Sequence, residues 1–169
     1  MEEKILFVLT GGTIDSKFEP TKDAVVPNEE STVSKYIAKL KLYNHCIFSK
    51  VCMKDSRDLT LGDRKNMLAA IEDSGCKKVI ITHGTYTIAE TAQYLQQKLK
   101  NNNLSVVLNG AMIPLEGFYP SDAPFNIGYA VSSIQHLPNG VYICMNGKVF
   151  KPEKVDKNEV EGRFEEKRE

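Results

Sequence analysis

Two short stretches of the sequence place threonine hydroxyls beside glycines, directly after apolar runs. The first is TGGT at residues 10–13, and the second is THGTYT at residues 82–87. A threonine hydroxyl can serve as the nucleophile of an acyl transfer, and a glycine main chain can approach a substrate closely. This chemistry also needs a base for the hydroxyl proton and donors for an oxyanion. Both stretches are therefore candidate catalytic loops.

The TGGT stretch has two other interpretations, an ordinary tight bend and a phosphate-binding loop. Glycines after a first strand suit any sharp strand-to-helix turn. A phosphate loop is disfavoured because the third glycine of G-x-G-x-x-G and the lysine of a Walker A loop are both lacking, and Pro20 and Pro27 argue against an immediate helix. The stretch alone does not decide between a bend and a catalytic loop.

The second stretch is more informative. Thr87 with Glu90 has the spacing of a capping box, which predicts a helix start. Thr85 has no such structural duty, and its hydroxyl would lie where helix N–H groups and the macrodipole favour developing negative charge. We interpret His83 as a strand-end histidine with satisfied hydrogen bonds.

Short apolar runs and segments of helical period alternate along the chain. Thr60 with Asp63 predicts another helix start, and Gly75 predicts a helix end. A more mixed run, Ile47–Met53, is expected nearer an edge of the sheet. The buried strands are expected at Ile5–Leu9, Val79–Thr82, Val106–Asn109 and Val141–Met145, and the helices around residues 33–40, 67–71, 88–99 and 127–134.

This alternation predicts an α/β fold, with a mostly parallel, Rossmann-like sheet covered by helices on both faces. Ligands of such sheets bind beyond the carboxyl ends of the strands. Nothing divides the chain into parts, so we expect one domain over residues 1–169. The charged tail, KPEKVDKNEVEGRFEEKRE, has the composition of a solvated end.

Composition narrows the class of partner. Lys+Arg and Asp+Glu both total 22 in 169 residues, so no net charge favours nucleic acid or an anionic membrane, and a small-molecule substrate is expected. The acidic start and short apolar runs predict neither a signal peptide nor a membrane span, hence a cytoplasmic location. The four cysteines lack metal-ligand spacing and are expected to be reduced.

Five motifs in one order carry a family resemblance. They are TGGTI, KDSRDLT, HGTYT, NGAM followed by SDAPFN, and MNGKVF with a later VDK, and they span residues 5 to about 164. The chain resembles the bacterial-type L-asparaginases, in which the third motif reads H-G-T-D-T. The resemblance covers only the larger N-terminal domain of that family. The usual C-terminal domain is absent from the sequence, as in the short single-domain asparaginases.

The resemblance implies an amidohydrolase that converts L-asparagine to L-aspartate and ammonia without a metal or organic cofactor. Thr13 matches the nucleophile, and Thr85 matches the second active-site threonine. Lys157 matches the lysine that hydrogen-bonds the second threonine. A lysine whose pKa is lowered by burial or charge can accept the hydroxyl proton.

Further residues are implied to bind the substrate. Asp55 and Ser56 fall where the carboxylate and main chain of the substrate are held, and the amide of Gly12 is expected to face the oxyanion. Tyr86 replaces the family aspartate that pairs with the α-ammonium group. A neutral phenol forms no such pair. Losing a partner from a desolvated charge pair commonly costs about 2–5 kcal/mol, so activity or specificity is expected to change.

The segment after TGGTI departs from the family as well, since it contains Phe18 where the family has a catalytic tyrosine, and Tyr86 or Tyr119 is the alternative source of a phenol.

Three functions remain open: an asparaginase, a non-catalytic amino-acid-binding module, and a nucleotide-binding domain. Larger relatives complete each site with a neighbouring subunit. We therefore expect a homodimer, or a dimer of dimers.

Overall fold

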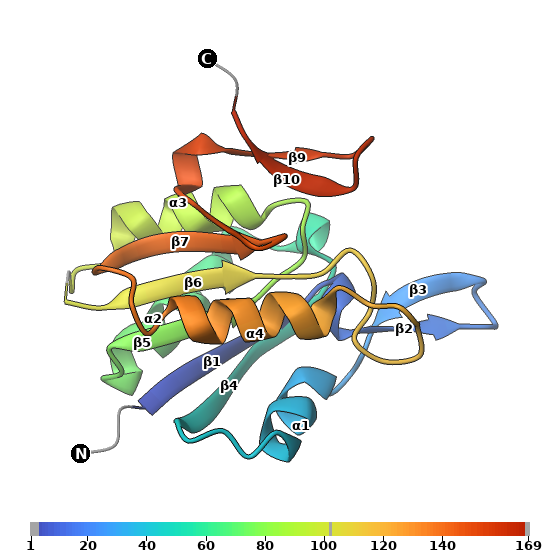
Figure 1. Cartoon of the computed structure of the whole chain (residues 1–169), viewed down its shortest axis with the longest axis horizontal. Coiled ribbons are helices and arrows are strands. Elements are labelled where there is room, and N and C mark those ends of the chain that lie inside the picture. The colour runs from blue at the N-terminus through green and yellow to red at the C-terminus, as the bar shows by residue number, and fades with distance from the viewer. Residues whose placement is uncertain (1–3, 102, 168–169) are drawn as a thin grey trace.

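The computed structural model describes residues 4–101 and 103–167. In these residues a six-stranded sheet forms the middle layer, in the order β4-β1-β5-β6-β7-β8, with β8 alone antiparallel (Figure 1). The mixed run does lie at an edge, as β4. None of the described helices has the length and apolar character needed to cross a bilayer. The strands are β1 (Lys4–Gly11), β4 (His45–Lys54), β5 (Lys78–Thr82), β6 (Ser105–Asn109), β7 (Gly140–Met145) and β8 (Lys148–Phe150).

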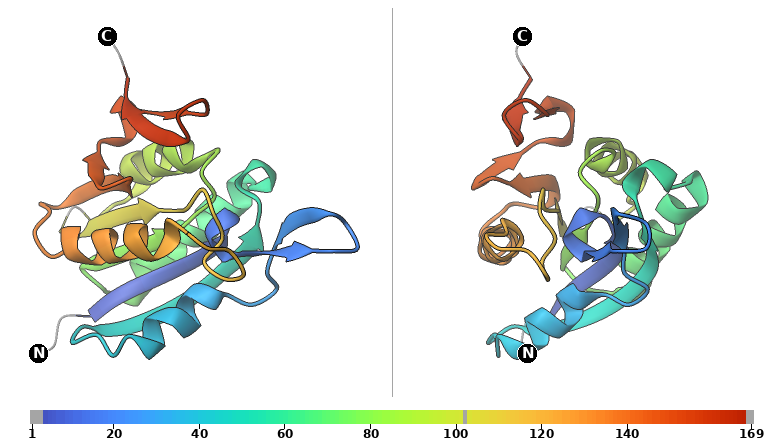
Figure 2. Two further views of the ribbon diagram at one scale, coloured as in Figure 1. Left: turned by 45° about the vertical axis from the view of Figure 1, so that its right-hand side comes forward. Right: turned by 90° about the vertical axis from the view of Figure 1, so that its right-hand side faces the viewer.

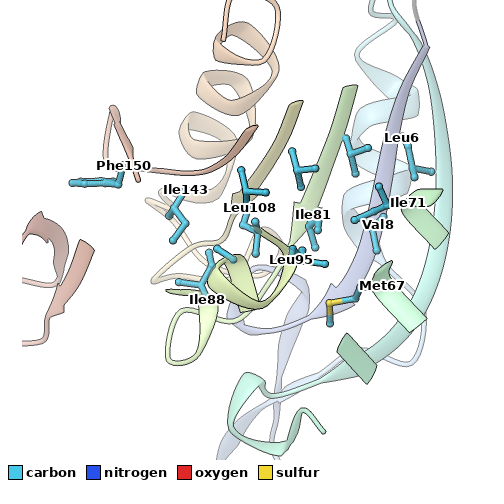
Figure 3. Close-up of a cluster of buried hydrophobic side chains, with 14 of the residues drawn as sticks. Leu6, Val8, Met67, Ile71, Ile81, Ile88, Leu95, Leu108, Ile143 and Phe150 are labelled. Carbon is cyan, nitrogen blue, oxygen red and sulfur yellow. The ribbon is translucent and has the colours of Figure 1, made fainter. Parts of the chain in front are cut away.

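Two helices cover each face of the sheet, as the alternating pattern predicts. Helices α2 (Leu61–Ser74) and α3 (Ile88–Lys98) pack on the face that carries Leu6 and Val8 of β1 (Figure 3). Helices α1 (Thr32–Lys39) and α4 (Ala123–Ser133) pack on the face that carries Ile5 and Phe7. Successive strand residues point to opposite faces, so an uninterrupted apolar run supplies both cores.

The predicted helix starts at α2 and α3 and the predicted end of α2 are right, but the capping box expected at α3 is wrong. Thr60 and Asp63 form a reciprocal capping box, and Gly75 ends α2 in the left-handed conformation at φ 63°. Thr87 precedes α3 but makes no side-chain cap. Its hydroxyl instead donates to the Ser56 carbonyl at 2.8 Å, because the loop after β4 lies beside it and offers a tertiary acceptor.

Two antiparallel hairpins are added to this sandwich. The first, β2 (Ser16–Glu19) and β3 (Ala24–Pro27), extends away from the body of the molecule (Figure 2). The second, β9 (Val155–Asn158) and β10 (Arg163–Glu166), is formed by the charged tail. The solvated-end interpretation is therefore wrong. Val155 and Phe164 are buried against the α2/α3 core, and two apolar anchors suffice to dock an otherwise charged hairpin.

Glycines hold three loops together at the carboxyl edge of the sheet. A Cβ on Gly12 would lie 2.3 Å from the Gly84 nitrogen, and a Cβ on Gly84 would lie 2.7 Å from the Cβ and Oγ of Ser56. Gly12 also has a φ of 81°, which other residues rarely adopt. The main chains after β1, β4 and β5 therefore touch one another directly.

Replacing Gly84 with alanine tests this packing. The added methyl group has no space beside Ser56, so Gly84→Ala should lower the free energy of unfolding by about 1–3 kcal/mol, measured by urea denaturation. The control is Gly128→Ala within α4, where an added Cβ meets nothing within 4 Å. That change should be neutral or stabilise by up to about 1 kcal/mol. Equal effects of the two changes would contradict the proposed contact.

Candidate active site

Four segments contribute the predicted site residues, and three of them follow neighbouring parallel strands. Thr13 begins a short 3-10 helix, η1 (Thr13–Asp15), after β1, and Ser56 begins another, η2 (Ser56–Asp58), after β4. Thr85 lies between β5 and α3. Lys157 comes from β9 of the C-terminal hairpin. Residues far apart in sequence meet because carboxyl ends of parallel strands share one edge.

The contact between Lys157 and Thr85 is the most specific feature of this region. The Lys157 ammonium nitrogen donates to the Thr85 hydroxyl at 2.9 Å, and Thr85 is only 3 % exposed. Burial lowers the pKa of Lys157, and the Arg57 charge lowers it further, whereas Glu159 and Asp55 act in the opposite direction. The lysine is thus held against a hydroxyl at a position where its pKa lies below the ordinary lysine value.

Tyr86 lies against two cationic side chains. The Lys157 nitrogen is 3.6 Å from the ring centroid, and the guanidinium carbon of Arg57 is 4.6 Å from it. The ring presents its negative face to both cations. The lysine therefore lies over the ring face of Tyr86. Half of the tyrosine remains exposed.

Asp55 is paired with Arg57 inside the same loop. Its carboxylate accepts from the Arg57 main-chain amide at 2.9 Å, from Nε at 3.0 Å and from Nη2 at 2.8 Å. These bonds lower the pKa of Asp55 and raise that of Arg57. The Asp55 carboxylate is therefore already paired with the Arg57 guanidinium at the site. Sequence reasoning overlooked Arg57, although its place next to Ser56 in KDSRDLT was the available signal.

Ser56 is buried at the junction of the loops. Its hydroxyl oxygen accepts from the Thr87 amide at 3.3 Å, and its carbonyl accepts from the Thr87 hydroxyl at 2.8 Å. Ser56 therefore joins the loop after β4 to the start of α3. Accepting these bonds leaves its own hydroxyl proton to donate to a further partner.

The Thr13 hydroxyl has no hydrogen-bond partner among the residues that the structure describes, and the side chain is partly buried. For the preceding residue, Gly12, the expectation that its amide faces an oxyanion is wrong. The Gly12 amide donates to the Lys54 carbonyl at 2.8 Å, so it is already engaged and does not face an oxyanion. Gly12 instead brings the Thr13 turn against Gly84, next to Thr85.

His83 is a structural residue, as interpreted from the sequence. It is fully buried, and burial lowers its pKa to about 4, so the ring is neutral near pH 7. Its Nδ1 lies 2.7 Å from the Gly84 carbonyl and therefore donates to it, which leaves Nε2 to accept from the Thr91 hydroxyl at 2.9 Å. Arg64 donates in turn to Thr91. This chain of bonds fixes the turn that carries Thr85.

Asp15 is a further residue that the motifs did not single out, and unlike Arg57 it is buried. Its carboxylate accepts from the Thr32 amide at 2.6 Å, from the Thr32 hydroxyl at 2.9 Å and from the Ser31 hydroxyl. These bonds tie η1 to the start of α1. The carboxylate thus gives the Thr13 turn a second anchor, besides the contact of Gly12 with Gly84.

Known proteins resemble the chain in fold and in sequence. The structure of L-asparaginase I from Vibrio cholerae has a TM-score of 0.81 at 23% identity, over 98% of this chain and 52% of its own. The thermostable L-asparaginase of Thermococcus kodakarensis has a TM-score of 0.79 at 25% identity, over 96% of this chain and 51% of its own. An L-asparaginase of the same archaeon is 34% identical over 79 residues, which are 47% of this chain and 24% of the relative.

The chain thus spans about half the length of the solved relatives that it matches. Within that half, the match is nearly continuous. The model of the asparaginase N-terminal family covers residues 4–164, a range that contains every loop of the site described above. The protein therefore belongs to the asparaginase family and contains its N-terminal domain.

Proposed function

We propose that the protein is an amidohydrolase that uses Thr13 as the nucleophile on a side-chain amide, with L-asparagine as the reference substrate. The single observation that carries this proposal is the hydrogen bond between Lys157 and Thr85, two residues 72 positions apart. Partial burial of Lys157 opposes its charge, so a lysine without a role in chemistry gains little from this position. A lysine that exchanges a proton with the Thr85 hydroxyl needs it.

The proposed reaction proceeds through an acyl-enzyme. The Thr13 hydroxyl oxygen attacks the amide carbon while its proton passes to Thr85, which gives its own proton to neutral Lys157. The tetrahedral oxyanion collapses, the C–N bond breaks, and the nitrogen leaves as ammonia with the proton that Lys157 returns. A water molecule then cleaves the ester by the same relay. One amide and one water give one carboxylate and one ammonium ion.

Stabilisation of the oxyanion is assigned to amides other than that of Gly12, whose N–H is engaged. The Thr13 amide opens η1, and the first amides of a helix have no partner within it. Substrate contacts are assigned to the Ser56 hydroxyl and to the loop that holds Asp55. Donors held in place by packed loops need no reorganisation during the reaction.

Release of ammonia from L-asparagine tests this proposal. Thr13→Ala, Thr85→Ala and Lys157→Met should each lower kcat/KM by about 10²–10⁴-fold or more, because each removes one member of the proton relay. Ser132→Ala, which removes an exposed hydroxyl on α4, is the matched control and should change nothing. Tyr86→Asp should raise the rate or lower KM. If wild type and Tyr86→Asp are both inert toward asparagine, glutamine and small ω-amides, the proposal is wrong.

The dependence of the rate on pH tests the role of Lys157. Only the neutral amine accepts a proton, so kcat/KM should rise with pH and reach a plateau above the pKa of Lys157. Burial lowers that pKa, which puts the midpoint below the ordinary lysine value. Tyr86→Asp should move the midpoint upward, because a carboxylate favours the charged form. A pH–rate profile without this limb, or one unmoved by Tyr86→Asp, would rule out the lysine as base.

A second candidate function is binding of an amino acid without turnover. The observation that favours it is the position of Tyr86, whose ring lies against the Lys157 nitrogen and attracts its charged form. In this case calorimetry should detect binding of L-aspartate while no ammonia is released. Tyr86→Asp alone should then fail to restore hydrolysis.

Self-association stays a prediction from the sequence. Size-exclusion chromatography with light scattering should give a homodimer, or a dimer of dimers, at micromolar concentration. A monomer under these conditions would remove the prediction.

The cytoplasmic location likewise stays a prediction.

A further inference from the structure

We propose that the preferred substrate is an ω-amide of a carboxylic acid that lacks an α-ammonium group, and that Arg57 binds its carboxylate. The inference rests on the proposed amide hydrolysis and specifies its substrate class. The charges next to the Lys157–Thr85 pair support it, because two cations, Arg57 and Lys157, lie against the ring of Tyr86.

The Arg57 guanidinium has donors to spare. Nε and Nη2 each use one N–H on the Asp55 carboxylate, in a side-on bidentate pair. A guanidinium has five N–H groups, so both protons of Nη1 and one of Nη2 remain. They form an end-on fork, the geometry that receives a carboxylate with two parallel bonds. The Arg57 side chain is 63% exposed, so a ligand can reach this fork.

A cationic group on the ligand would find no comparable partner. Asp55 already has both oxygens bonded to Arg57. Two further acidic residues influence the two cations, Asp58 near Arg57 and Glu159 near Lys157, and both are exposed to solvent, which screens them. An α-ammonium group would instead be placed near two like charges.

The side chain at position 86 also shapes the charge of this region. Tyr86 turns its ring toward both cations and carries no carboxylate, so neither Arg57 nor Lys157 has a carboxylate counter-ion at position 86. A ligand with one carboxylate and one neutral amide matches this arrangement, with the carboxylate at Arg57 and the amide near Thr85. Specificity is a difference between affinities, and here repulsion of the α-ammonium contributes as much as attraction of the carboxylate.

Three amides of similar length separate these contributions. Succinamate is asparagine without its amino group, and butyramide also lacks the carboxylate. With wild-type protein, kcat/KM for succinamate should exceed that for L-asparagine by about tenfold or more. Arg57→Gln should lower kcat/KM for succinamate by roughly 10–100-fold, mostly through KM, and leave butyramide unchanged. Tyr86→Asp should reverse the preference toward L-asparagine.

The matched control is Lys50→Gln. Like Arg57, Lys50 is an exposed, ion-paired cation, but it lies on β4. It should leave all three amides unchanged. A preference of wild type for L-asparagine over succinamate, or an equal loss on succinamate and butyramide in Arg57→Gln, would overturn the inference while leaving amide hydrolysis intact.

Calorimetry decides the inference without turnover. Succinate should bind wild type more tightly than L-aspartate does, and Arg57→Gln should abolish the difference. If no amide is hydrolysed, the proposed function fails, yet this comparison still tests the ligand class. Equal or tighter binding of L-aspartate, or no binding of succinate, would overturn the inference.

Discussion

Direct contact between main chains at the carboxyl edge of the sheet determines the rest of the site. A side chain on Gly12 would strike Gly84, and a side chain on Gly84 would strike Ser56, so neither position has room for one. Side chains on these glycines would separate the loops by the width of a methyl group or more. A displacement of about 1 Å is enough to impair a nucleophile, so the two threonines depend on residues without side chains.

The second requirement is the docking of the C-terminal hairpin. Lys157 reaches Thr85 only because β9 and β10 lie beside α3, and the hairpin is held there by Val155, Phe164 and the bond from the Phe164 amide to Asn146. Burial of two apolar side chains offsets the loss of freedom of a charged segment. The same docking partly buries the lysine, which lowers its pKa. Position and reactivity of the amine therefore have one physical cause.

The charges around positions 57 and 86 distinguish this chain from the general pattern of the family. A tyrosine at position 86 and an arginine at position 57 convert a site expected to hold a carboxylate into one with two cations against the same aromatic ring. Asp55 is absorbed into an ion pair with Arg57. The resulting charge pattern suits an anionic ligand better than a zwitterionic one.

Local sequence determined the parallel strands, the helices and the Thr60–Asp63 cap, because periodic burial and neighbouring side chains decide these features within a few residues. The motifs also singled out Thr85 and Lys157, which the structure joins by a hydrogen bond, and Thr13, whose role stays a prediction. Only the tertiary structure decided that Thr87 bonds to Ser56 instead of capping α3, and that the Gly12 amide is engaged by Lys54. Each of these contacts joins loops or groups whose competition for partners depends on three-dimensional distance, and periodicity along the chain carries no record of that distance.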